Sequence, residues 1–202
     1  MKSERSWLLL VLLTLAIVSL LAPAAPAQDT SVLRPPKGEK LALIVFEDLQ
    51  CPDCARANPL LEEAARTYKI KLVRYDFPLP MHNWAFDAAL FARYFESKSE
   101  KLGHDYRDYI FRNQMQVTKE NLRNLTGQWA QAHKSDLPFV IDPQGKLAAA
   151  IRADQALAQR VHIEHTPTIY VVNNSRQGTP FVEVVDRTQL FQMIDAMKAE
   201  AR

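Results

Sequence analysis

Cysteine is scarce in this chain of 202 residues: Cys51 and Cys54 are the only two, and two residues separate them. Small exported proteins that depend on disulfides carry an even set of cysteines spread along the sequence, and this chain has no such set. A disulfide that closes so short a loop removes little chain entropy, so it would stabilise the fold only weakly. Four cysteine or histidine ligands at zinc spacing are also missing. The remaining interpretation of the pair is a reversible redox switch.

Runs of basic residues are absent too. The chain has 25 lysines and arginines against 23 aspartates and glutamates, a formal net charge of +2. No basic patch interleaved with aromatic residues is present, which is the pattern that binds phosphate backbones. We therefore expect no nucleic-acid partner.

Long apolar runs are missing except near the N-terminus. There, Lys2 and Arg5 precede a charge-free run of fifteen residues, Trp7 to Leu21. This run is shorter than the ~20 residues that span a bilayer, and Ala25-Pro26-Ala27 has the small-x-small pattern of a signal-peptidase site. We expect residues 1–27 to be a cleaved secretory signal peptide, which leaves the protein outside the cytoplasm. An uncleaved membrane anchor is the alternative, and no cysteine follows the run for a lipoprotein anchor.

The chain after the signal predicts a βαβ unit. Residues 28–39, with two prolines and a glycine, are expected to be a linker. The continuous apolar run at 40–46 predicts a central strand covered on both faces. A helix is expected to begin at Pro52, with a kink at Pro59, and the alternation over 68–77 predicts a second strand. The two cysteines then lie at the carboxyl end of the first strand.

A helical region of about four helices is predicted over 84–159. Breaks are expected near Gly103, at Val117–Thr118 and at Leu137–Pro138. Several aromatic and small residues of the first helix share one face, namely Trp84, Ala88, Phe91 and Phe95. We interpret that face as core packing and not as a ligand site.

The C-terminal part predicts a return to strands. Apolar runs from Thr166 and from Pro180 are separated by a glycine-containing turn, which predicts an antiparallel hairpin, and a last helix is expected over 187–199. The whole pattern is βαβ, a helical insertion and then ββα, in one α/β domain over 40–202.

The position of the cysteines predicts their roles. Cys51 at the amino end of a helix gains from the unpaired N–H groups and the helix dipole, which stabilise its thiolate. Cys54 lies one turn further on and is the resolving partner. Pro52 suits the first helical turn, where its missing N–H is not needed. We expect Cys51 to be the exposed, attacking sulfur and Cys54 to be more buried.

Three segments, "FEDLQCPDC", "DFPLPMHNWAFDAALFARYF" and "VHIEHTPTIYVVN", resemble in order and spacing the thioredoxin-like superfamily. Within it, the chain is similar over about 38–200 to the DsbA-like exported thiol-disulfide oxidoreductases. The resemblance implies a thioredoxin-like fold with a helical insertion before a cis-proline strand. It makes Thr166 and Pro167 the cis-proline loop, which faces the cysteines and offers backbone groups to a substrate strand. A trans Pro167 that only begins a strand is the alternative.

Two positions depart from the family near the cysteines. The family commonly has a buried acid where this chain has Val45, and Glu47 has the same strand parity and would reach the same face. The interpretation we prefer for Glu47 and Asp48 is solvation at a strand end. Asp53 stands where strongly oxidising members have histidine, and a carboxylate disfavours a nearby thiolate. Asp53 therefore predicts a milder oxidant.

A third departure is His165, where glycine is frequent in the family. This histidine would supply charge to the thiolate or a proton to the leaving sulfur. A solvent-facing loop residue is the slightly preferred interpretation. The other histidines show no mutual spacing of a metal site, so no metal and no cofactor are expected.

The resemblance implies a periplasmic, or otherwise extracytoplasmic, thiol oxidase that introduces disulfides into reduced exported polypeptides. It also implies reoxidation by a membrane quinone-linked oxidase of the DsbB or vitamin K epoxide reductase type. A reductase or isomerase that uses the same pair is one alternative. A copper chaperone that binds through Cys51, Cys54 and a histidine is another, because thiolates suit that soft metal. A redox-inert binding module of the same fold is the third.

Overall fold

The computed structural model describes residues 30–176 and 179–202. The predicted signal peptide, residues 1–27, and the first two residues of the predicted linker lie outside the described part. Within that part, no helix combines the length and the apolar character that crossing a membrane requires.

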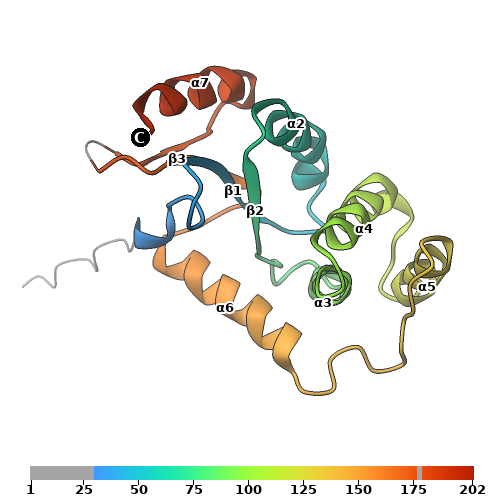
Figure 1. Ribbon diagram of the computed structural model, residues 1–202. Helices are drawn as coiled ribbons and strands as arrows, with labels where there is room; N and C mark the ends of the chain where they lie inside the picture. Colours follow the sequence, from blue (N-terminus) through green and yellow to red (C-terminus); the bar gives the residue numbers. More distant parts are fainter. Residues whose placement is uncertain (1–29, 177–178) are drawn as a thin grey trace, which may run out of the picture.

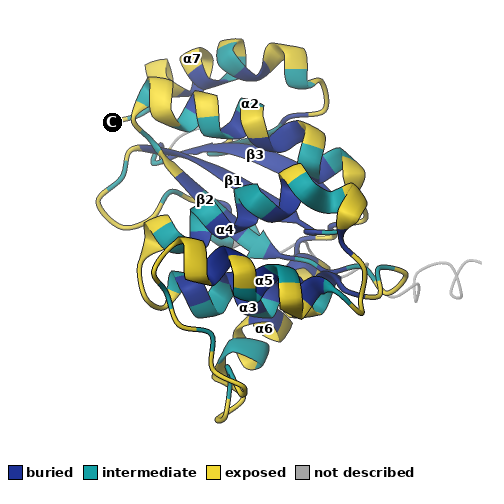
Figure 2. Ribbon diagram, turned by 90° about the vertical axis from the view of Figure 1, so that its right-hand side faces the viewer, coloured by how far each residue is buried: buried dark blue, intermediate teal, exposed yellow. Residues whose placement is uncertain are grey.

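A four-stranded mixed sheet is the centre of the fold (Figure 1). Its strands are β1 (Leu41–Glu47), β2 (Lys71–Asp76), β3 (Thr168–Asn173) and β4 (Phe181–Glu183), in the spatial order β2-β1-β3-β4. β1 is parallel to β2 and antiparallel to β3, and β3 and β4 form the predicted antiparallel hairpin. Every residue of β1 is buried, which confirms the prediction of a central strand covered on both faces. Figure 2 shows β1 and β3 as the buried layer between helices whose outer sides are exposed.

Helices cover both faces of the sheet (Figure 1). α2 (Pro52–Tyr68) and α7 (Leu190–Glu200) pack on one face, where the odd-numbered residues of β1 meet them. α6 (Lys146–Arg160) packs on the other face against the even-numbered residues. This division follows from the strand period, because neighbouring side chains of a strand point to opposite faces. Three short 3-10 helices complete the described part, at Thr30–Val32 (η1), Gln114–Gln116 (η2) and Arg187–Gln189 (η3).

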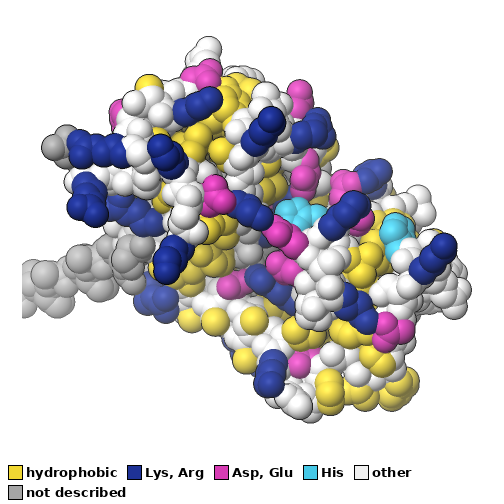
Figure 3. Space-filling model, viewed as in Figure 1, with side chains coloured by type: hydrophobic (Ala, Val, Ile, Leu, Met, Phe, Trp, Pro, Cys, Tyr) yellow, Lys and Arg dark blue, Asp and Glu magenta, His cyan; other side chains and the backbone are white. Residues whose placement is uncertain are grey.

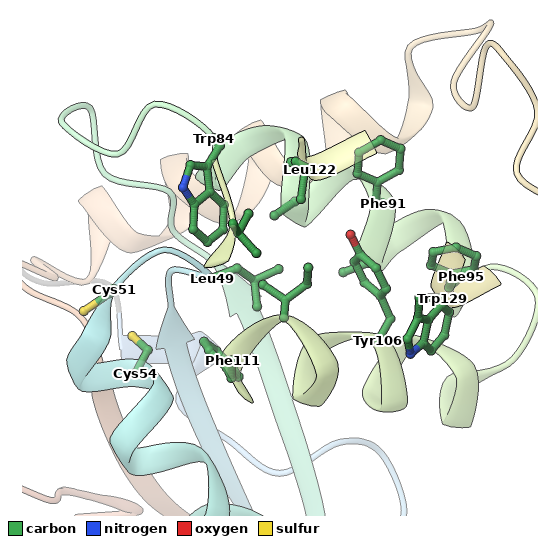
Figure 4. Close-up of a cluster of buried hydrophobic side chains, with 14 of the residues drawn as sticks. Leu49, Cys51, Cys54, Trp84, Phe91, Phe95, Tyr106, Phe111, Leu122 and Trp129 are labelled. Carbon is green, nitrogen blue, oxygen red and sulfur yellow. The ribbon is translucent and has the colours of Figure 1, made fainter. Parts of the chain in front are cut away.

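Four helices lie between β2 and β3, in agreement with the predicted number. They are α3 (Ala85–Glu96), α4 (Glu100–Asn113), α5 (Leu122–Ala132) and α6. The helical face predicted to pack in the core is buried throughout, with Trp84, Ala88, Phe91 and Phe95 all below a tenth exposed. These side chains join Tyr106 and Trp129 in one cluster, which extends to the two cysteines (Figure 4). The prediction of core packing is therefore confirmed.

The break expected near Gly103 is present, but Gly103 itself does not cause it. α4 runs through Gly103, and the chain breaks earlier, before Ser99, whose side chain accepts a hydrogen bond from the Leu102 N–H as a helix N-cap. A Cβ atom at Gly103 would lie 2.6 Å from the Cβ of Glu96 on α3. The glycine therefore allows α3 and α4 to approach closely and does not interrupt the helix.

Candidate active site

Cys51 is the N-cap residue of α2, and Pro52 is the first helical residue. The Cys51 N–H donates to the carbonyl of Asp48 (3.0 Å), which closes the turn between β1 and the helix. Both cysteines are free thiols in this structure. Figure 4 shows their sulfurs at the start of α2, at the edge of the aromatic cluster. The strand-to-helix turn thus presents both sulfurs at one end of the sheet.

The two sulfurs have opposite acid-base properties. A hydrogen bond from the Cys54 thiol is the main reason that the pKa of Cys51 is low. Burial opposes this effect, but the pKa of Cys51 still falls to about 5. Thr166 and the backbone N–H groups of Cys54 and Asp53 also favour the thiolate. Burial raises the pKa of Cys54 well above its usual value, and the neighbouring Cys51 raises it further. At neutral pH one sulfur is therefore a thiolate and the other a thiol.

Cys51 is less accessible than the sequence predicted. The residue is 7% exposed and Cys54 is 2% exposed, so the expected order holds although Cys51 itself is buried. The reason is the loop before β3, whose Thr166 carbonyl oxygen lies 3.3 Å from the Cys51 sulfur. The Thr166–Pro167 peptide bond is cis, the isomer expected for this loop. Thr166 is also largely buried, whereas His165 points to solvent.

The expectation that Glu47 and Asp48 are solvated is wrong, because both are almost fully buried. The Glu47 carboxylate is paired with two buried arginines, Arg74 (2.5 Å to Nη1) and Arg107 (3.2 Å to Nη1). Arginine pairing of this kind lets a carboxylate remain charged away from water. Glu47 lies close enough to Cys54 for its charge to contribute to the raised pKa of that thiol.

Asp48 organises the turn that carries the cysteines, a role that the sequence analysis missed. Its carboxylate accepts hydrogen bonds from the backbone N–H groups of Gln50 (2.6 Å) and Leu79 (2.7 Å) and contacts His82 Nδ1 (2.7 Å). Its own N–H donates to the sulfur of Cys54 (3.5 Å). The short spacing from Asp48 to the cysteines was visible in the sequence, but two of the partners of Asp48, Leu79 and His82, come from the distant loop between β2 and α3.

Gln114, in η2, is a second residue that the sequence analysis missed. Its side-chain amide donates to the carbonyl groups of Leu49 (2.8 Å) and Cys51 (3.0 Å). The C-terminal end of α4 therefore holds the turn that carries the cysteines. No feature of the sequence around Gln114 indicates this contact.

Asp53 does not act as the isolated carboxylate that the sequence argument assumed. It pairs with Arg187, which lies 134 residues further along the chain, and with Arg56 one turn on. Burial alone would raise the pKa of Asp53, but the hydrogen bonds and charges of the two arginines lower it. The carboxylate is thus charged and compensated, which weakens its predicted effect on the Cys51 thiolate.

The described residues contain no group of three or more histidine, cysteine, aspartate and glutamate side chains arranged to hold a metal ion. Charges on the face shown in Figure 3 are mixed, with lysines and arginines scattered among acidic side chains. The chemistry that this site offers is that of a low-pKa thiolate beside a second thiol.

Comparisons with known proteins agree with the fold. Residues 38–188 match the family Thioredoxin_4, described as thioredoxin. The thiol-disulfide exchange protein alpha-DsbA2 from Wolbachia pipientis is 15% identical with a TM-score of 0.65, over 81% of this chain and 85% of that one. A periplasmic thioredoxin-like protein from Salmonella enterica serovar Typhimurium is 19% identical (TM-score 0.65; 82% and 88% covered), and BdbD from Bacillus subtilis is 16% identical (TM-score 0.64; 83% and 90%). A search of curated protein sequences finds no match.

Proposed function

Because the chain belongs to the thioredoxin family, we propose that it catalyses thiol-disulfide exchange through Cys51 and Cys54, and that it acts as an oxidase of exported polypeptides. In the oxidised protein, a substrate thiolate attacks the Cys51 sulfur of the Cys51–Cys54 disulfide. A mixed disulfide forms on Cys51, and Cys54 leaves and takes up a proton. A second substrate thiolate then attacks the substrate sulfur of the mixed disulfide, and Cys51 leaves as a thiolate. The substrate gains one disulfide, and the protein becomes a dithiol.

The single observation that carries the oxidase direction is the position of Cys51 as the N-cap of α2 beside Cys54, whose hydrogen bond lowers the pKa of Cys51 to about 5. A thiol of low pKa is a good leaving group, and a stable thiolate favours the reduced form of the pair, so the disulfide becomes a stronger oxidant. The high pKa of Cys54 suits a sulfur that ends each cycle protonated. Thr166 lies against Cys51, and Thr166 and Pro167 are proposed to offer backbone groups to an extended substrate strand.

The place of action is proposed from the neighbours and from the sequence. The Salmonella neighbour is described as periplasmic and the Wolbachia neighbour as a thiol-disulfide exchange protein. The predicted signal peptide, residues 1–27, supports an extracytoplasmic location for this chain as well. Reduced exported polypeptides are the proposed substrates, and a membrane quinone-linked oxidase is the proposed reoxidant. The N-terminal sequence of the exported protein tests cleavage after Ala27.

Equilibration with glutathione buffers tests the direction of electron flow. We expect a reduction potential between about −180 and −120 mV, the values of protein disulfide isomerase and of the strong oxidant DsbA. A value near the roughly −270 mV of thioredoxin would instead support a reductase. The variant Cys51→Ala is the control, since it cannot form the internal disulfide and should show no such equilibrium. Purified protein that carries stoichiometric copper would favour the chaperone alternative.

The pH dependence of this potential is a further expected result. Below the pKa of Cys51, reduction consumes two protons for two electrons, and the potential falls by about 59 mV per pH unit. Above about pH 5, Cys51 stays ionised, so only Cys54 takes up a proton and the slope halves to about 30 mV per pH unit. Potentials measured in buffers from about pH 4 to 8 locate the change of slope. A slope that remains at about 59 mV through neutral pH would contradict the low pKa of Cys51.

A further inference from the structure

Arg187 connects the C-terminal part of the chain to the first turn of the active-site helix. One of its guanidinium nitrogens, Nη2, donates to the Asp53 side chain at 2.8 Å, and the other, Nη1, donates to the Asp53 backbone carbonyl at 3.3 Å. This fork fixes the side chain and the main chain of the same residue. Asp53 lies between the two cysteines, so Arg187 reaches the redox motif without touching either sulfur.

The segment that carries Arg187 is itself held in place. Val184 N–H donates to the carbonyl of Ile169 (2.8 Å), which ties the chain just before η3 to the strand that follows the cis-proline loop. Asp186, the N-cap residue of η3, also binds within this segment: its carboxylate accepts hydrogen bonds from the N–H and the hydroxyl of Thr188. These hydrogen bonds hold the backbone of Arg187 in place, and the neighbouring Asp186 carboxylate is bound to Thr188.

The two arginines that pair with Asp53 differ in how far they are exposed to water. The side chain of Arg56, the second partner, is 67% exposed, whereas that of Arg187 is 34% exposed. Water screens an exposed ion pair more strongly, so Arg187 is the more effective counter-charge. Together the two arginines and Asp53 carry a net charge of +1. Without Arg187, the carboxylate of Asp53, two residues from Cys51, would have only the exposed Arg56 to compensate it.

We propose that Arg187 is a positioning residue for thiol-disulfide exchange: it holds and neutralises the Asp53 carboxylate, so that this carboxylate does not disfavour the Cys51 thiolate. The inference rests on the proposed function of Cys51. It explains how an acidic residue inside the motif is compatible with a stabilised thiolate. The physical basis is simple, because a like charge near an ionising group disfavours its charged form and an adjacent opposite charge cancels this effect.

The test is a double-mutant cycle on Asp53 and Arg187, read by the ultraviolet absorbance of the thiolate as a function of pH. We expect Arg187→Gln to lower the thiolate-to-thiol ratio of Cys51 at a fixed pH by about 3- to 10-fold. In the Asp53→Asn background, the same substitution should change the ratio by less than about twofold, because the carboxylate that Arg187 compensates is gone. Arg187→Lys keeps the charge but loses the fork, so its effect should be smaller.

Arg56→Gln is the matched control, since it removes the exposed partner of the same carboxylate and should shift the ratio less than Arg187→Gln. A ratio that Arg187→Gln leaves within about twofold of the wild type would overturn the inference. So would an equal shift with and without Asp53, because Arg187 would then act on the thiolate directly. If the wild-type protein forms no thiolate below neutral pH, the proposed function of Cys51 fails and the inference fails with it. A wild-type thiolate that Arg187→Gln does not alter overturns the inference alone.

Discussion

Alkylation of the reduced protein at about pH 6 is expected to modify Cys51 and to leave Cys54 intact. At that pH, about nine-tenths of Cys51 is thiolate, given its pKa of about 5, whereas Cys54, whose pKa is raised above 9.0, is almost entirely protonated. The ionised fractions therefore differ by at least about a thousandfold, and the lower intrinsic nucleophilicity of a low-pKa thiolate reduces this advantage. We expect Cys51 to react about 10 to 100 times faster. Peptide mapping after a short exposure to iodoacetamide measures both rates.

The same asymmetry predicts different outcomes for the two cysteine variants. Cys51→Ala is expected to abolish exchange completely, because Cys54 is both protonated and nearly inaccessible, at 2% exposure. Cys54→Ala is expected to retain attack by Cys51 and to accumulate mixed disulfides with substrates, since no resolving thiol remains. Non-reducing electrophoresis of the two variants distinguishes these results. Preferential labelling of Cys54, or mixed disulfides on Cys54 alone, would reverse the roles assigned here.

The position of the cysteine pair and the architecture could be predicted from the sequence because their signals are local. A continuous apolar run gives β1, helical spacing gives α2, and both cysteines lie at the junction between them. The Thr166–Pro167 bond was expected to be cis from the resemblance of its flanking segment, and the loop lies against Cys51. Each of these features depends on neighbouring residues or on an order of elements that a single sequence displays.

The electrostatics of the site could not be predicted, because the pairs that decide it are distant in sequence. Glu47 looked like a solvated strand end until Arg107, 60 residues away, was placed beside it. Asp53 looked like an uncompensated carboxylate, but in the fold it pairs with Arg187, which is 134 residues away in the sequence. Charged residues carry no periodic signal of their partners, so only the tertiary structure reveals which charges are paired. The same limit explains Gly103, whose role is contact with another helix.

Arg107 is the centre of a buried ion cluster beneath the active site. Its guanidinium contacts both carboxylate oxygens of Asp76 (2.6 and 3.1 Å) and one oxygen of Glu47 (3.2 Å). The three side chains are 2%, 1% and 2% exposed. Burial alone would raise the pKa of Asp76, but Arg107 and Arg93 lower it. The cluster joins α4 to the ends of β1 and β2, the end of the sheet from which the cysteines emerge.

Arg107→Met is therefore expected to destabilise the reduced protein by about 3 kcal/mol, since removing one partner of a buried ion pair leaves charges unmatched. Lys71→Met is the matched control: Lys71, on β2, also forms an ion pair, with Glu100, but that pair is exposed and its loss should cost less than about 1 kcal/mol. Urea unfolding of both variants measures the difference.

The pH dependence of the Arg107→Met effect distinguishes lost charge pairing from lost packing. Because the folded-state pKa of Asp76 lies below its usual value, its contribution to stability is present at neutral pH and disappears as the pH falls through that folded pKa. The stability difference between the wild type and Arg107→Met should therefore shrink in acid, where the carboxylate that Arg107 stabilises becomes neutral in both proteins. A penalty that is equally large at neutral and acid pH would identify packing of the long side chain, and not its charge, as the contribution of Arg107.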